Sequence, residues 1–175
     1  AIDTLFKGGT PVVGTGANFS QGTDLFITRL SADGSQAVGS TYLGGTGSDG
    51  VNMQLRNNYG DASRGEVNLD SHGNILIASC TLSADFPNTT GAMVGGGQDG
   101  AICKLSADLT QLHWSAYLGG IDEDAAFSVA EINGKVYVTG ATASNTFPTT
   151  SGSFSDTYLG GSSDGFLTAI DSTNG

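Results

Sequence analysis

The nine-residue stretch Gly73-Asn74-Ile75-Leu76-Ile77-Ala78-Ser79-Cys80-Thr81 has a second copy of similar pattern in this chain. It aligns without a gap on Gly134-Lys135-Val136-Tyr137-Val138-Thr139-Gly140-Ala141-Thr142, and Phe-Pro follows both copies, at 86–87 and 147–148. Short β-branched and aromatic runs between glycines and aspartates are typical of β-strands separated by tight turns. The middle of each copy is apolar on both faces, whereas a strand with one wet face would alternate. The pattern therefore predicts strands that are buried on both sides.

Two further patterns recur around this stretch. An Asp followed by apolar residues opens at Asp24, Asp99 and Asp164, and Ser-Thr-Tyr-Leu-Gly-Gly at 40–45 returns as Ser-Ala-Tyr-Leu-Gly-Gly at 115–120. In the middle copy these patterns predict four strands, near 64–70, 73–82, 100–106 and 110–117. The other copies predict strands near 2–6, 11–17, 24–31 and 36–43, and near 125–131, 135–142 and 165–171. The chain is therefore expected to be all-β.

Four-stranded antiparallel units that are buried on both faces and repeat around an axis describe a β-propeller. We expect about three blades of a larger ring, since known propellers need at least four blades to close. The expected blades cover residues 1–45, residues 46–120 with a loop insertion at 46–59, and residues 121–175. The last blade lacks its fourth strand, which leaves strand 165–171 with a free edge. The remaining blades or another polypeptide are the expected partners that complete the ring.

Composition narrows the classes of function. The 17 acidic and 6 basic residues give a net charge of −11, which argues against a nucleic-acid binder and against docking on an anionic membrane surface. The chain has 28 glycines but only 3 prolines, which excludes a collagen-like or Pro-rich chain. No apolar run approaches the roughly 18 residues of a membrane-spanning helix, so no membrane insertion is expected.

The residues also resemble a known family. The string Asp-Gly-Phe-Leu-x-x-Ile at 164–170, the Ser-Thr-Tyr-Leu-Gly-Gly box and the segment 73–87 are similar to the bacterial β-propeller (SBBP-type) repeat. Residues 57–104 look especially like copies in large secreted surface proteins of Bacteroidetes, many of which end in gliding-motility-type or type IX secretion sorting domains. The resemblance covers about residues 20–175. It implies a segment of a secreted or cell-surface protein and says little about activity.

The long loops are the expected ligand-binding face. If the first strand of each unit is innermost, the long loops gather at one end of the ring and the short hairpin turns at the other. Function usually resides on long loops over a rigid scaffold. The candidate ligand-binding residues there are Tyr59, Arg56, Asp49, Asp61 and Tyr158. The alternative is that the insertion at 46–59 only covers the neighbouring blade through Val51, Met53 and Leu55.

Three consecutive acids, Asp122, Glu123 and Asp124, are a candidate Ca²⁺ site, because this cation takes six to eight oxygen ligands. The alternative is a solvated acidic loop, since no segment has the spaced pattern of an EF-hand loop. No other cofactor is expected.

The two cysteines, Cys80 and Cys103, lie on adjacent strands of one expected blade. A disulfide requires Cα atoms within about 7 Å, which directly opposed positions meet. The alternative is that both cysteines are small buried hydrophobes.

No catalytic set of residues stands out in the sequence, so the chain is not expected to be an enzyme. We expect part of a secreted or cell-surface propeller that acts as a binding or adhesion scaffold, with a glycan or another cell-surface ligand on the long-loop face. Two alternatives stay open. One is part of a carbohydrate-active propeller enzyme, and the other is a purely structural spacer.

Overall fold

The structure, a computed structural model, describes residues 3–9, 11–14, 17–56, 60–90, 93 and 95–175. These residues form antiparallel β-sheets joined by loops and by a short 3₁₀ turn, η1 (Asp61–Ser63). The all-β prediction is confirmed.

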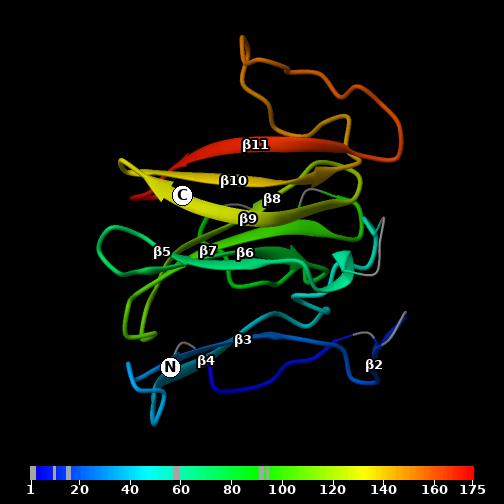
Figure 1. Ribbon diagram of the computed structural model, residues 1–175. Coiled ribbons are helices and arrows are strands. Elements are labelled where there is room, and N and C mark those ends of the chain that lie inside the picture. Colours follow the sequence, from blue (N-terminus) through cyan, green and yellow to red (C-terminus); the bar gives the residue numbers. More distant parts are fainter. Residues whose placement is uncertain (1–2, 10, 15–16, 57–59, 91–92, 94) are drawn as a thin grey trace.

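Three sheets stack on one another, and each keeps its strands in chain order (Figure 1). Unit 1 consists of β3 (Leu25–Leu30) and β4 (Ala37–Leu43). Unit 2 consists of β5 (Glu66–Leu69), β6 (Ile75–Thr81), β7 (Asp99–Leu105) and β8 (Leu112–Leu118). Unit 3 consists of β9 (Asp124–Ile132), β10 (Lys135–Thr142) and β11 (Asp164–Asp171). The predicted strands of units 2 and 3 lie within about two residues of the observed ones.

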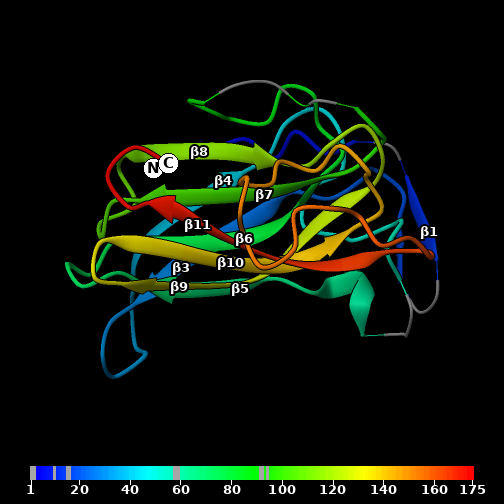
Figure 2. The same ribbon diagram turned by 90° about the horizontal axis from the view of Figure 1, so that it is seen from above.

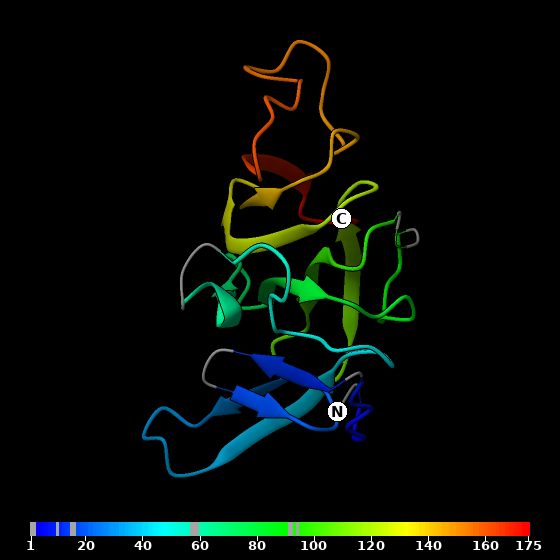
Figure 3. The same cartoon turned by 90° about the vertical axis from the view of Figure 1, so that its right-hand side faces the viewer.

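The two kinds of connection separate to opposite ends of the stack. Short hairpin turns follow β3, β5, β7 and β9 at one end, and the long loops 83–98 and 143–163 leave the sheets at the other (Figure 2). We call these the hairpin end and the long-loop end. The loop 143–163 projects away from the stack beyond unit 3 (Figure 3).

Unit 2 is the centre of the apolar core. All residues of β6 and β7 are buried, because one face of the sheet packs on unit 1 and the other on unit 3. In β10 the prediction of burial on both faces is wrong. Val136 and Val138 face unit 2 and are buried, whereas Tyr137 is half-buried and Thr139 is exposed. Within the described residues, no further sheet covers that side of unit 3.

The expected inner strands of the first blade are not found beside β3. Residues 3–9 form no strand, and β1 (Val12–Gly14) and β2 (Ala17–Phe19) pair only with each other. The preceding segment is held at the start of β3, because the N–H groups of Lys7 and Gly8 donate to Asp24 Oδ2, at 2.6 and 3.3 Å. In Figure 2, β1 crosses the end of the sheets rather than lying along β3. The predicted strands 2–6 and 11–17 are therefore wrong as sheet partners of β3; residues 2, 15 and 16 lie outside the described residues.

The loop insertion begins later than the sequence predicted. Gly44-Gly45-x-x-x-Asp49 matches Gly119-Gly120-x-x-x-Asp124 at a constant offset of 75, and Asp124 is the first residue of β9. Asp49 likewise forms an isolated bridge with Thr81, so it occupies the start of the first strand of unit 2. The chain then leaves the sheet and returns to pair at Glu66 with Ala78. The extra residues therefore follow Asp49 instead of spanning 46–59.

The cysteines are buried and free, so the disulfide prediction is wrong. The strand register is the reason. Cys103 lies opposite Ile77 and Cys80 lies opposite Gly100, which offsets the two cysteines by three residues, or about 10 Å along the strands. Burial raises the pKa of the Cys80 thiol to about 12, as expected of a small hydrophobe in the core.

Candidate functional site

A polar clamp joins units 1 and 2 at the long-loop end. The buried Asp49 carboxylate accepts hydrogen bonds from the Gly45 N–H at 2.8 Å, the Ser83 hydroxyl at 2.8 Å and the Thr81 hydroxyl. The Ser83 N–H donates to the Thr81 hydroxyl at 2.9 Å, and the Gly47 N–H donates to the Ser83 hydroxyl at 2.8 Å. These bonds tie the loop that leaves unit 1 to the end of β6 in unit 2.

The same clamp joins units 2 and 3. Asp124 accepts hydrogen bonds from the Gly120 N–H at 2.7 Å and the Ser144 hydroxyl at 2.8 Å. The Ser144 N–H donates to the Thr142 hydroxyl at 2.9 Å, and the Asp122 N–H donates to the Ser144 hydroxyl at 2.8 Å. The partners are a Thr-x-Ser that ends the second strand, at 81–83 and again at 142–144. This recurring triplet was the sequence signal for the clamp, and sequence reasoning missed it.

A second carboxylate lies beside each clamp aspartate. Asp99 Oδ1 and Asp124 Oδ2 lie 2.2 and 2.7 Å from the point where a Cβ of residue 119 would stand. Around Gly44, the corresponding distances are 2.6 Å for Asp24 Oδ1 and 2.8 Å for Asp49 Oδ2. Only glycine leaves room for such a pair. A glycosidase also needs two nearby carboxylates, but this pair occurs at both junctions and is tied into the clamp, which favours an architectural role.

Burial raises the pKa of Asp49 to about 6, and the nearby charge of Asp24 adds to the rise; hydrogen bonds from Thr81, Gly45 and Ser83 work against it. Burial also raises the pKa of Asp124. The clamp carboxyls therefore bind a proton more readily in the folded chain than in the unfolded chain.

We expect the contribution of Asp49 to stability to fall as the pH rises from 3.8 to about 6. Its pKa is higher in the folded state, so its contribution is complete below the unfolded value and is lost as the pH rises through the folded value. Across this window, the free energy of unfolding measured with urea should fall on the order of 2 kcal/mol further for the wild type than for Asp49→Asn. The control is Asp33→Asn, because hydrogen bonds from Ser31 and Ser35 lower the pKa of exposed Asp33 to about 2, outside the window. Identical pH profiles for wild type and Asp49→Asn would contradict the expectation.

The three acids of the candidate Ca²⁺ site are not brought together. Asp122 is exposed, Asp124 is buried in the clamp, and Glu123 Oε1 accepts a hydrogen bond from the Gly97 N–H at 3.2 Å. Among the described residues, no group of three or more His, Cys, Asp or Glu side chains could hold a metal ion. The Glu123 and Asp124 carboxylates therefore have hydrogen-bond partners within the chain.

The candidate ligand-binding residues are dispersed. Asp49 and Asp61 are buried, and Asp61 pairs with Arg64 at 3.2 Å. Tyr158 is half-buried, and its hydroxyl donates to the Gly161 carbonyl at 3.0 Å. Arg56 is exposed on the insertion, and Tyr59 lies outside the described residues. Of the described candidates, Arg56 is the one that is exposed.

The insertion that carries Arg56 is anchored to the core by a buried amide network. The Gln98 side chain donates to Asn52 Oδ1 at 2.9 Å and to the Asp124 carbonyl at 3.1 Å, and it accepts from the Met53 N–H at 2.7 Å. Asn52 in turn exchanges two hydrogen bonds with the backbone of buried Leu55. The insertion therefore covers the junction of units 2 and 3 through Leu55, as its alternative interpretation stated, and it also carries the exposed Arg56.

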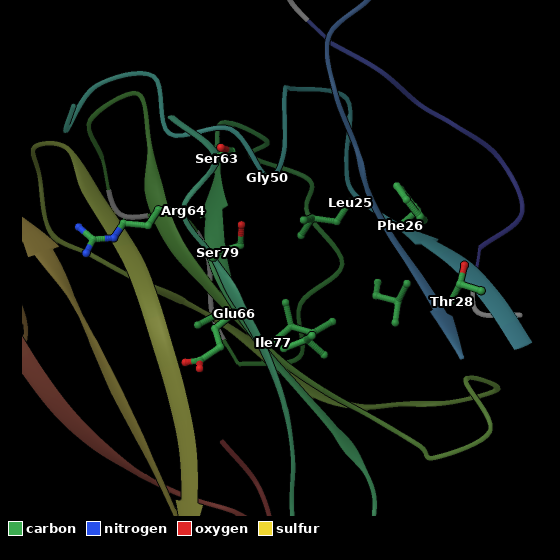
Figure 4. Close-up of a pocket in the computed structure, with 13 residues that line it drawn as sticks. Leu25, Phe26, Thr28, Gly50, Ser63, Arg64, Glu66, Ile77 and Ser79 are labelled. Carbon is green, nitrogen blue, oxygen red and sulfur yellow. The ribbon is translucent and has the colours of Figure 1, made fainter. Parts of the chain in front are cut away.

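A groove of about 390 Å³ lies between β3 and the β5–β6 pair (Figure 4). Leu25, Phe26, Ile27 and Thr28 line it from unit 1. From unit 2 it is lined by residues including Arg64, Glu66, Val67, Ile77 and Ser79. It is mostly apolar, and it lies where a further strand beside β3 would run.

Comparison with known proteins does not assign the chain to a family. No protein-family model matches the chain, and no curated protein matches it. In the part of the chain that the structure describes, no helix is long and apolar enough to span a membrane.

Proposed function

We propose that units 1 to 3 are consecutive blades of a secreted or cell-surface bacterial β-propeller of the SBBP type, which acts as a binding and adhesion scaffold. The observation that carries this proposal is the clamp that occurs with the same partners at both junctions. When the same contact joins each unit to the next, each unit is related to its neighbour by the same rotation. Propellers are built by such repetition.

The outer edge of β11 supports the presence of further strands in the complete assembly. In unit 2, β8 pairs with β7 as the fourth strand, and Thr89 lies beside β8, where its N–H donates to the Ser115 carbonyl at 3.0 Å. Unit 3 has no equivalent of β8 among the described residues, and its loop leaves Phe154 and Leu159 exposed. A fourth strand from another part of the ring would pair with β11 and cover these side chains.

The proposed ligand-binding surface is the long-loop end, around the insertion. Arg56 offers a planar fork of hydrogen-bond donors, and the segment directly before it, residues 52–55, is anchored by the buried Asn52–Gln98 network. Anchoring of this segment lowers the entropy that is lost when a ligand binds beside it. The proposed ligand is a glycan, for which Arg56 supplies donors and the neighbouring Tyr59 of the sequence supplies an aromatic ring.

A glycan array probed with the labelled chain tests this function. We expect Arg56→Ala and Tyr59→Ala each to weaken binding to the array hits by about tenfold, the usual cost of a contact worth 1.4 kcal/mol. The control is Lys135→Ala, an exposed base at the hairpin end, which should bind as the wild type does. Point variants are used because deletion of the whole insertion would also remove buried Asn52 and Leu55. No array binding, or an equal loss in Lys135→Ala, would overturn the proposed ligand site.

A further inference from the structure

We propose that the groove between β3 and β5–β6 docks a β-hairpin of a separate polypeptide, whose second strand is apolar on both faces like β6. This inference rests on the proposed propeller, since the hairpin would supply the two strands that unit 1 needs beside β3 to form a four-stranded blade. It is independent of the ligand at the long-loop end.

The inner edge of β3 is the first part of this docking site. Four consecutive residues of β3, Leu25 to Thr28, line the groove. Successive side chains of a strand point to opposite faces, so only the edge of β3 can present all four. Its equivalent in unit 2 is β7, as the matching Asp24 and Asp99 show, and β7 pairs with β6 on one side and β8 on the other. Among the described residues, β3 pairs with β4 alone, so the position equivalent to β6 is open.

The exposed face of β5 is the second part. Val67 and Leu69 pair directly with Ile77 and Ile75, so all four side chains point toward unit 1. The two isoleucines of β6 are buried against β3, but Val67 is 63% and Leu69 59% exposed. The buried contact between units 1 and 2 therefore continues directly into an uncovered apolar surface.

The junction of units 2 and 3 shows what covers such a surface. There the first strand of the later unit, β9, keeps Val129 at 1% exposure. The β5–β6 hairpin covers it: Asn68 Nδ2 donates to the Val129 carbonyl at 3.0 Å, and Glu66 Oε2 accepts from the Val129 N–H at 2.7 Å. Among the described residues, no equivalent hairpin covers the side of β5 that carries Val67 and Leu69. The occupant inferred from this comparison is a hairpin of the composition of residues 64–83, with acid and amide side chains on its first strand.

Binding of a labelled peptide to the intact chain tests the inference. The probe is a synthetic peptide of residues 64–83 with Cys80→Ser, followed by fluorescence anisotropy. We expect saturable binding, and we expect Val67→Lys with Leu69→Lys in the chain to weaken it by on the order of tenfold to a hundredfold, because two apolar contacts become buried charges. The matched control is Leu167→Lys on unit 3, which is 69% exposed and far from the groove and should leave binding unchanged. A peptide with Ile75→Pro and Ile77→Pro should not bind, because its second strand cannot pair.

Hydrogen exchange separates the outcomes. Peptide binding should slow exchange of the β3 amides, which pairing at this edge protects. Absence of binding, or binding that only Leu167→Lys weakens, would overturn the inference. A dimer in ultracentrifugation that the Val67→Lys, Leu69→Lys variant dissociates would replace the separate hairpin with a second copy of this chain. Failure of glycan binding with peptide binding intact would count against the proposed ligand site alone.

Discussion

Replacing Lys104 with methionine is expected to lower the free energy of unfolding by about 3–5 kcal/mol, the usual cost of removing one partner of a buried ion pair. Lys104 Nζ lies 2.9 Å from Asp70 Oδ2 and donates to the Ser172 carbonyl at 2.8 Å and its hydroxyl at 3.0 Å. Burial pushes the pKa of Asp70 upward, but hydrogen bonds from Lys104 and Asn74 hold it well below its ordinary value. Without the cation, this carboxylate stays buried and loses its charge partner. Urea unfolding at neutral pH measures the loss.

The matched control is Arg29→Met at the other junction. Arg29 stands at the position equivalent to Lys104 and donates to the Ala107 carbonyl at 2.6 Å, but from an exposed position. Its removal should cost no more than about 1 kcal/mol. Adding Asp70→Asn to Lys104→Met should recover part of the stability, because it removes the unpaired charge. Equal losses for Lys104→Met and Arg29→Met would contradict this account of the junction.

Trp114→Ala should be similarly damaging, with a loss of about 3–5 kcal/mol. The indole is buried in the cluster between units 2 and 3, and its Nε1 donates to the same Ser172 carbonyl at 3.1 Å. Truncation leaves a cavity at a junction that two units share. Circular dichroism follows the unfolding, since the variant lacks the only tryptophan of the chain.

Two variants locate the cause of that loss. Trp114→Phe should recover most of the stability, because it keeps an aromatic ring and loses one hydrogen bond worth about 1 kcal/mol. His113 is the exposed neighbour of Trp114 on the opposite face of β8. The free energy of unfolding of His113→Ala should therefore stay within about 0.5 kcal/mol of the wild-type value. If His113→Ala were as destabilising as Trp114→Ala, the buried junction would not be the source.

The sequence predicted the strands well where a repeat could be compared with a second copy. Glycine, aspartate and Phe-Pro positions fix the register of units 2 and 3, so β6 and β10 lie where the offset of 61 placed them. Residues 1–19 match no other copy, and the predicted inner strands of the first blade failed there. Strand burial failed at β10 for a different reason: its side chains are apolar enough, but the described residues provide no neighbour on one side.

The roles of the acidic residues could not be predicted from their charge, because the sequence does not show which side chains they contact. Asp49 and Asp124 were predicted as a ligand acceptor and a metal ligand because they are acidic residues in long loops. Their roles become clear only with their partners, the hydroxyls of Ser83 and Ser144, which lie 34 and 20 residues away in the chain. The cysteines show the same limit, since a shift of three residues in strand register separates a disulfide from two buried thiols.

Cryo-electron microscopy of the longest polypeptide that carries this sequence tests the central claim, that units 1 to 3 are consecutive blades of a propeller. The account predicts a closed ring in top view, with antiparallel sheets stacked around one axis and a further strand seated beside β11. An open linear stack of sheets, or two sheets packed face to face as a sandwich, would contradict it.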